Sequence, residues 1–331
     1  MNTISRWLGA AAAATLALGL AACSADAQAA PQPGDPVTVK VATLGLISDG
    51  ALLLGMEQGF FEEEGLKIET SIVANPPAGL SAAQSGQIDI AYSPSISVLT
   101  ALNQSLPLKV VAPADGYPAG AAQADDPFEL DITGLFASAQ SGITEIGDLA
   151  GKTIAVPARK AHMEIVIADE LQRAGIDPNS GVSWVVLDFT SAVAALKSGS
   201  VDAAGLVSPF NIRAAEEGSV QISAPSVGFF EGAGATNFWN AGASTVQAKP
   251  EMIAAFQRAL LKSNAYAMEH MDEGIQKGIE YSKSQLTPDQ IVKPVWPTDL
   301  RVEDLDIPNR KMVDLGFFPA AADLSDVVWK G

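Results

Sequence analysis

The sequence predicts an α/β protein with two lobes, each a mostly parallel sheet flanked by helices, joined by a hinge that the chain crosses twice. Two observations support this fold class. Strand and helix patterns alternate along the chain, as they do in parallel α/β sheets, and one stretch of sequence recurs in its second half. The length of 331 residues suits two lobes, and an apolar fraction of 48% can supply their cores.

The N-terminal segment has the pattern of an export signal. It carries one cation, Arg6, and an apolar run over residues 8–22 that is too short to span a bilayer as a stable helix. Cys23, the only cysteine, directly follows Leu-Ala-Ala and resembles the acylated cysteine of a bacterial lipobox. The sequence therefore predicts a lipoprotein signal peptide over residues 1–22 and lipidation of Cys23.

Export and lipidation place the mature protein outside the cytoplasm, anchored to the cell membrane by lipid. Residues 23–36, rich in Ala, Gln, Pro and Asp, form a predicted flexible tether. Ordinary secretion, with cleavage nearer Ala29 or Ala30 and loss of Cys23, is the alternative. No later apolar run reaches ~18 residues, so no further membrane span is predicted.

The net charge of −18 predicts an acidic surface. Such a surface disfavours nucleic acid and polybasic membrane contact, and it favours solubility outside the cell. A local basic pocket could still bind an anionic small ligand. With one cysteine, which the lipid would modify, no disulfide is expected.

The first lobe begins with four strand patterns separated by helices. The predicted strands are 37–42, 66–72, 88–91 and 108–112, and the predicted helices are 51–61, 75–85 and one that starts near residue 93.

The second lobe is predicted over residues 140–225, with its first strand at 153–156. The chain then returns through 228–243 and a long helix over 250–283. The first lobe therefore comprises residues 37–139 and 226–331.

A short repeat supports two related lobes. The stretch SGQIDIA at 85–91 recurs as SGSVDAA at 198–204, each after an Ala-rich helix and before a Ser-Pro pair. Because neighbouring elements recur in the same order, we interpret the repeat as a shared strand-helix-strand arrangement. Chance recurrence of a common Ser-Gly turn is the alternative.

Candidate ligand-binding residues follow from one rule of open α/β sheets. Ligands bind beyond the carboxyl ends of the strands, where helix N-termini offer free N–H groups. Each of these side chains could equally be only a helix cap. The residues at such ends are Ser48, Asp49, Asn75, Pro76, Pro77, Tyr92, Ser93 and Ser95 in the first lobe, and Arg159, Lys160, His162, Asp188, Thr190 and Ser208 in the second.

Arg159 is the most specific of these candidates. Arg159, Lys160 and His162 precede a predicted helix, where cations oppose the helix dipole unless an anion lies between them. Pairing with Asp188 or Glu164, or plain surface charge, is the alternative. Trp239, in an aromatic cluster near the return crossing, is a candidate ligand wall, or simply core.

Several stretches together resemble one family of transport proteins. The chain is similar to the substrate-binding proteins of ABC importers, in the branch for nitrate, taurine, alkanesulfonates and thiamine-precursor pyrimidines. The resemblance covers nearly all of the mature chain. The matching stretches are QGFFEEEGL at 58–66, SGQIDIA at 85–91, SGI at 141–143, DLAGKTIAV at 148–156 and LGFF at 315–318.

This resemblance implies a two-lobed periplasmic-binding-protein type II fold that closes over one small molecule. It implies an ABC permease and its ATPase as partners, in agreement with a lipid anchor. A monomer is expected, with no cofactor and no metal.

Two departures from the branch bear on the ligand. Arg159-Lys160 stands where relatives often have Gly-Ser, which favours a carboxylate or another organic anion. VSPF at 207–210 replaces the frequent Trp-Asp-Pro-Tyr, which removes an acid that could pair with an amine such as that of taurine. The cysteine-rich iron motif of pyrimidine-synthesising relatives is absent.

The leading hypothesis is a binding lipoprotein for a small organic anion, a sulfonate or an aromatic carboxylate, anchored by Arg159. The second keeps the transport role but binds a neutral or cationic heterocycle such as a pyrimidine, anchored by Asp49 and Asp188. An enzyme is disfavoured, because only two histidines and no catalytic motif occur. A ligand-binding subunit for a membrane sensor kinase would have the same fold.

Overall fold

A computed structural model describes residues 35–118, 120–231 and 234–331. The stretch from Pro36 to Gly331 forms one compact unit. The expected signal peptide, the lipidation site Cys23 and nearly all of the tether lie outside the described residues. Within the described residues, no helix combines the length and the apolar character needed to cross a membrane.

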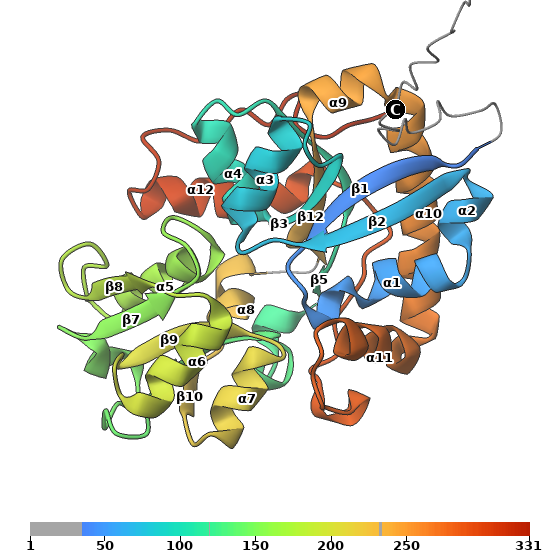
Figure 1. The fold of residues 1–331 in the computed structure, drawn as a ribbon. Helices are drawn as coiled ribbons and strands as arrows, with labels where there is room; N and C mark the ends of the chain where they lie inside the picture. The colour runs from blue at the N-terminus through green and yellow to red at the C-terminus, as the bar shows by residue number, and fades with distance from the viewer. Residues whose placement is uncertain (1–34, 119, 232–233) are drawn as a thin grey trace, which may run out of the picture. The chain divides into compact units, whose positions relative to one another are not determined.

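The first sheet has the strand order β2-β1-β3-β12-β4 (Figure 1). β1 pairs in parallel with β2 and β3, whereas β12 pairs antiparallel with both β3 and β4. Four strands therefore run in one direction and β12 runs against them. The strands are β1 (Val37–Thr43), β2 (Leu66–Ile72), β3 (Ile90–Pro94), β4 (Leu108–Pro113) and β12 (Asn237–Gly242).

Helices cover both faces of this sheet, and the alternation of side chains along β1 decides what each face packs against. Val39 and Val41 pack with Phe256 of α10, whereas Ala42 packs with Ala83 of α3. The helices of this lobe are α1 (Gly50–Glu57), α2 (Phe60–Glu63), α3 (Pro76–Gln84), α4 (Ser95–Asn103), α9 (Ala243–Ala248), α10 (Pro250–Glu269), α11 (Met271–Tyr281) and α12 (Asp306–Asp314).

The second sheet has the order β10-β6-β9-β7-β8, and again one strand, β6, runs against the others. Its strands are β6 (Thr133–Ala137), β7 (Thr153–Val156), β8 (Ser183–Val186), β9 (Ala203–Val207) and β10 (Val220–Ser223). Its helices are α5 (His162–Arg173), α6 (Phe189–Ser198), α7 (Phe210–Glu216) and α8 (Pro225–Phe230). The mostly parallel sheets that the sequence predicts are therefore present in both lobes.

The repeat in the sequence corresponds to equivalent strands of the two sheets. Read from β8, the second sheet matches the first strand for strand, with β9 in the place of β3. Asp89, before β3, accepts a hydrogen bond from the Lys40 N–H of β1 at 2.9 Å. Asp202, before β9, accepts one from the Thr153 N–H of β7 at 2.8 Å. The shared aspartate thus hydrogen-bonds to the backbone of the neighbouring central strand in each lobe.

The chain crosses between the sheets twice. β5 (Gly116–Tyr117) and β11 (Gly234–Ala235), one from each crossing, pair as a short antiparallel ribbon. β6 already belongs to the second sheet, although the predicted start of lobe II at residue 140 places it in lobe I. The local pattern of β6 is that of any buried strand, so its sheet is set by pairing with distant β9. The exact lobe boundaries stay a prediction.

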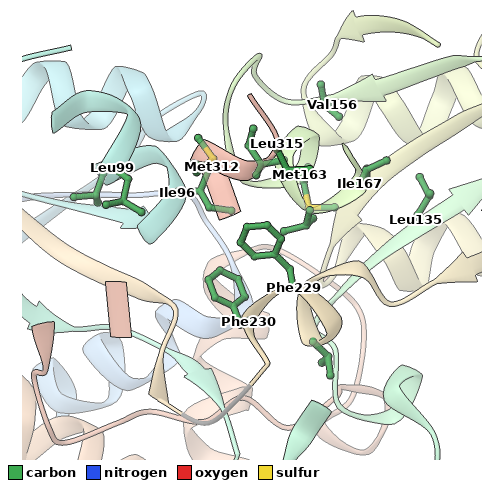
Figure 2. Close-up of a cluster of buried hydrophobic side chains, with 14 of the residues drawn as sticks. Ile96, Leu99, Leu135, Val156, Met163, Ile167, Phe229, Phe230, Met312 and Leu315 are labelled. Atoms are coloured by element: carbon green, nitrogen blue, oxygen red, sulfur yellow. The ribbon is translucent and has the colours of Figure 1, made fainter. Parts of the chain in front are cut away.

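A continuous apolar cluster joins helices of both lobes (Figure 2). In Figure 2, Phe229 and Phe230 of α8 lie between Ile96 and Met312 on one side and Met163 and Ile167 on the other. The two lobes are therefore in apolar contact as well as connected by the hinge. The remaining short 3-10 helices are η1 (Ile47–Asp49), η2 (Ala121–Gln123), η3 (Pro127–Glu129), η4 (Ile146–Leu149), η5 (Pro288–Gln290) and η6 (Val302–Leu305).

Candidate functional site

A cavity lies where the carboxyl ends of strands from both sheets meet. Residues at the ends of β3 and β9 and residues after β1, β2, β7 and β8 contribute to its wall, as the rule for open α/β sheets predicts. The lining residues are Leu44, Leu46, Pro76, Tyr92, Pro94, Tyr117, Ile132, Thr133, Pro157, Ala161, His162, Met163, Phe189, Val207 and Asn237.

This cavity, which we call the interlobe cavity, is small and uncharged. Its volume is about 50 Å³, enough for a few waters but below the ~300 Å³ at which ligand pockets begin. None of its described lining residues is Lys, Arg, Asp or Glu. An organic ligand would therefore need the lobes to separate before it entered.

His162 is the one lining residue with a buried, unused hydrogen-bonding atom. The side chain is 8% exposed, and Nε2 lies 2.8 Å from the Ser226 hydroxyl. Nδ1 is buried and has no hydrogen-bond partner among the described residues. The ring stacks on Phe230, with centroids 5.7 Å apart. Burial lowers the pKa of His162 to about 4, so the ring is neutral at physiological pH.

Asp131 connects the two crossings behind His162. One oxygen accepts hydrogen bonds from the Tyr117 hydroxyl at 2.8 Å, the Thr133 N–H at 2.9 Å and the Thr133 hydroxyl at 2.7 Å. The other accepts from the N–H groups of Ser226 at 2.9 Å and Val227 at 3.1 Å. Burial raises the pKa of Asp131, against these hydrogen bonds, which lower it.

Asp115 performs the same task beside the first sheet. It is fully buried and accepts hydrogen bonds from the Tyr92 hydroxyl at 2.8 Å and from the Asn237 amide. Its backbone oxygen accepts the N–H groups of Thr236 and Asn237 at 3.0 Å, which ties it to the second crossing. Burial raises the pKa of Asp115 to about 6.

Ser48 and Asp49 lie in η1, next to the interlobe cavity. Asp49 accepts the Leu46 N–H at 2.8 Å, and burial raises its pKa to about 7. Ser48 and Ser208 face a neighbouring cavity of about 10 Å³, the size of a single water. The structure thus brings these two predicted residues together from opposite lobes.

Arg159 and Lys160 line a second, larger cavity of about 450 Å³ instead, together with Pro77 and residues of α3 and α4. The Arg159 guanidinium donates to both oxygens of Glu164, at 2.8 and 2.9 Å. The pairing with Glu164 that the sequence left open is therefore present. The cations that were expected to anchor an anion do not reach the interlobe cavity.

Four other predicted residues lie outside the interlobe cavity. Ser93 and Ser95 are fully buried in and after β3. Asp188 caps α6 by accepting the Ser191 N–H at 2.9 Å, which is the capping role left open above. Trp239 packs edge-on against Tyr92 and Phe256 in the core, because β12 is an inner strand with both faces covered.

Five residues of the crossings were not predicted from the sequence, namely Asp115, Tyr117, Asp131, Thr133 and Ser226. Their partners lie up to 122 residues away along the chain, so no local spacing joins them. The one signal in the sequence that could have identified Asp115 and Asp131 is that each is an isolated aspartate at the edge of an apolar segment. Among the described residues, no group of three or more His, Cys, Asp and Glu could hold a metal ion.

The sequence pattern of a family described as NMT1/THI5 like matches residues 50–274. No curated protein sequence matches the chain. The alkanesulfonate-binding protein SsuA from Xanthomonas axonopodis pv. citri, bound to MOPS, has a TM-score of 0.70 at 16% identity, over 91% of this chain and 100% of its own.

Two further solved structures are similar. The periplasmic nitrate-binding protein NrtA from Synechocystis PCC 6803 has a TM-score of 0.71 at 14% identity, over 88% of this chain and 84% of its own. The Candida albicans CA3427 product, with the generic periplasmic binding protein fold, has a TM-score of 0.70 at 15% identity, over 89% and 96%. These likenesses confirm the predicted two-lobed fold.

Proposed function

Because this chain belongs to the NMT1/THI5-like family, we propose that it is the extracytoplasmic substrate-binding component of an ABC importer. It binds one small molecule between its lobes and delivers it to a permease and its ATPase. The observation that carries this proposal is a cavity lined from both lobes at the carboxyl ends of their strands. The protein acts by binding, as a monomer, and not by catalysis.

Two of the similar solved structures support a transport role. One is an alkanesulfonate-binding protein and the other is a periplasmic nitrate-binding protein. A location outside the cytoplasm agrees with the N-terminal export pattern. Lipidation at Cys23 would keep the protein at the membrane beside its permease, where successive captures and deliveries need no long diffusion.

The chemistry of the interlobe cavity favours a neutral or cationic heterocycle over an organic anion. The described lining residues include no cation, whereas Asp49, Asp115 and Asp131 are buried close by. An anion held there would face carboxyl groups in a medium of low dielectric constant, with no side-chain counter-charge. The ring stack of His162 on Phe230 and the apolar walls fit a flat ligand such as a pyrimidine.

The uncapped N-terminus of α5 adds hydrogen-bond donors to this site. The N-cap residue of α5, Ala161, makes no side-chain capping hydrogen bond, and Ala161, His162 and Met163 all line the cavity. First-turn N–H groups of a helix bind ligand oxygen or nitrogen acceptors well. A heterocycle with both donors and acceptors would use them together with His162.

A small organic anion remains a second candidate, because the second cavity is lined by Arg159 and Lys160. In that case a sulfonate or an aromatic carboxylate would lie between α4 and the loop before α5. The two candidates make opposite demands on side chains, since only the anion needs Arg159.

A calorimetric and thermal-shift screen against pyrimidines, sulfonates, aromatic carboxylates and nitrate tests both. A ligand at ~100 times its Kd adds ~2.7 kcal/mol to the unfolding free energy. Binding of a pyrimidine that survives Arg159→Ala supports the leading proposal. Binding confined to anions and lost in Arg159→Ala selects the second candidate, and no binding by any compound contradicts both ligand classes.

A further inference from the structure

We propose that His162 is a specificity-determining hydrogen-bond acceptor, whose Nδ1 selects ligands that present an N–H or O–H donor. The inference rests on the proposed binding role of the interlobe cavity and adds the direction of one hydrogen bond in it. A series of hydrogen bonds runs from Asp131 through the hydroxyl groups of Thr133 and Ser226 to the His162 ring.

Asp131 sets the direction of the first hydrogen bond in this series. Three backbone N–H groups, from Thr133, Ser226 and Val227, point at its two oxygens, and an N–H group can only donate. The Tyr117 and Thr133 hydroxyls reach the same carboxyl. Such a set of donors stabilises the ionised carboxylate, which accepts hydrogen bonds and offers no proton.

The direction of the remaining bonds then follows one by one. The Thr133 hydroxyl gives its single proton to Asp131 at 2.7 Å, so toward Ser226, also at 2.7 Å, it can only accept. The Ser226 hydroxyl therefore donates to Thr133 and accepts from His162. The His162 ring must carry its proton on Nε2, 2.8 Å from the Ser226 oxygen.

A neutral imidazole with its proton on Nε2 has a lone pair on Nδ1. That atom is buried and without a partner among the residues that the structure describes, which is costly unless a ligand supplies a donor. The stack on Phe230 and the bond to Ser226 hold the ring plane. An anionic oxygen placed at Nδ1 would meet another lone pair.

The other polar side chains among the described lining residues already donate their protons within the protein. The Tyr92 hydroxyl donates to Asp115, and the Asn237 amide donates to Asp115 and Thr236. The Tyr117 hydroxyl donates to Asp131. Buried aspartates thus take up the side-chain donors, and the side chains facing a ligand are left as acceptors.

The protonation of His162 can be read in the ligand-free protein by long-range ¹H–¹⁵N correlation at pH ~8.5, where an ordinary imidazole is neutral. The chain has only two histidines, which makes assignment direct. The other, His270, is an internal control of opposite type, because its Nδ1 donates to the Tyr266 carbonyl at 3.0 Å. We expect the proton of His162 on Nε2. A proton on Nδ1 overturns the inference.

Ligand discrimination is tested with 4-aminopyrimidine and its 4-dimethylamino analogue, which lacks the N–H donor. His162→Gln keeps a group at the Nε2 position and removes the Nδ1 acceptor, whereas His162→Asn places an amide oxygen near Nδ1. We expect His162→Gln to weaken 4-aminopyrimidine at least tenfold and leave the analogue unchanged, and His162→Asn to retain most of the preference.

The two tests separate this inference from the proposed function. Equal loss for both pyrimidines in His162→Gln overturns the acceptor role while leaving the binding function intact. If neither pyrimidine binds the wild-type protein, the proposed ligand class fails, and the nitrogen spectrum alone decides whether His162 is an acceptor.

Discussion

Arg159 and Glu164 form a two-point ion pair at the start of α5, with guanidinium nitrogens 2.8 and 2.9 Å from the two carboxylate oxygens. The Glu164 side chain is 1% exposed, whereas that of Arg159 is 49% exposed. Glu164 also accepts the Lys160 N–H. Arg159 therefore neutralises the charge of a buried carboxylate of the same protein. Two of its guanidinium nitrogens are already hydrogen-bonded before any ligand binds.

Replacing Arg159 by alanine should reduce stability and spare the binding of a pyrimidine. The change leaves Glu164 buried with one remaining donor, which we expect to cost roughly 1–3 kcal/mol of unfolding free energy. Urea denaturation and calorimetry measure the two effects. Arg213→Ala is the matched control, because its i,i+4 pair with Glu217 is at the surface and should contribute about 0.5 kcal/mol or less. Normal stability with a tenfold loss of affinity would instead identify Arg159 as the ligand anchor.

Replacing Asp131 by asparagine should weaken the connection between the crossings. An amide group has two N–H donors of its own, so it must oppose some of the N–H groups of Thr133, Ser226 and Val227. We expect a loss of roughly 2–3 kcal/mol by urea denaturation. Asp126→Asn, at the exposed cap of η3, should change stability little. Equal effects of the two substitutions would contradict a special role for Asp131.

Asp49 should make the protein less stable as pH rises from ~4 to ~7, whereas His162, whose pKa burial lowers from 6.5 to about 4, contributes in the opposite direction. Burial raises the pKa of Asp49 to about 7 from the ordinary 3.8. Because the pKa of Asp49 is higher in the folded state than in the unfolded state, its protonated form favours folding. This stabilisation is complete below pH ~4 and is lost as the pH rises through ~7. At 1.36 kcal/mol per pKa unit the change from Asp49 is on the order of 4 kcal/mol.

Asp49→Asn should flatten this pH dependence without abolishing it. Asp115 and Glu170, with pKa values raised by burial to about 6 and about 7, contribute in the same direction. Denaturation at a series of pH values measures the slope. Asp148→Asn is the control. Asp148 is exposed and hydrogen bonds from Thr144 lower its pKa, so its loss should not flatten the slope. An unchanged slope in Asp49→Asn would show that Asp49 is ionised throughout.

Replacing Gly278 by alanine should destabilise the protein although alanine favours helices. A Cβ there would lie 2.2 Å from the Ile47 carbonyl oxygen, so α11 and η1 would have to separate. We expect a net loss of about 1–3 kcal/mol, measured by thermal and urea unfolding. Gly147→Ala is the control, because the nearest atom to its Cβ would be 3.7 Å away. A stabilised Gly278→Ala variant would refute the close packing.

Order along the chain could be predicted from the sequence, because it depends on local patterns. The alternation of strands and helices and the equivalence of Asp89 and Asp202 are both present in the structure. The strand-end rule also identified His162 and Tyr92, which line the interlobe cavity. For those residues, position after a strand was enough.

Side-chain direction could not be predicted in the same way. Arg159 follows a strand as His162 does, but its long side chain reaches Glu164 instead of the interlobe cavity. Trp239 lies on a strand with both faces buried, so alternation gave no reason to prefer core or ligand. Asp131 meets Ser226 at a separation of 95 residues, which only the closed topology of two crossings brings together.

The place of β12 between β3 and β4 has a consequence for how the protein is made. The second sheet is continuous in sequence from β6 to β10, so it can assemble as soon as that stretch is complete. The first sheet stays in two pieces until β12 arrives, after the whole second sheet has been synthesised. Until then the facing edges of β3 and β4 are unpaired, and unpaired edges recruit strands from other chains. A defect that delays folding of the second lobe would therefore cause aggregation through the unpaired edges of β3 and β4 in the first lobe.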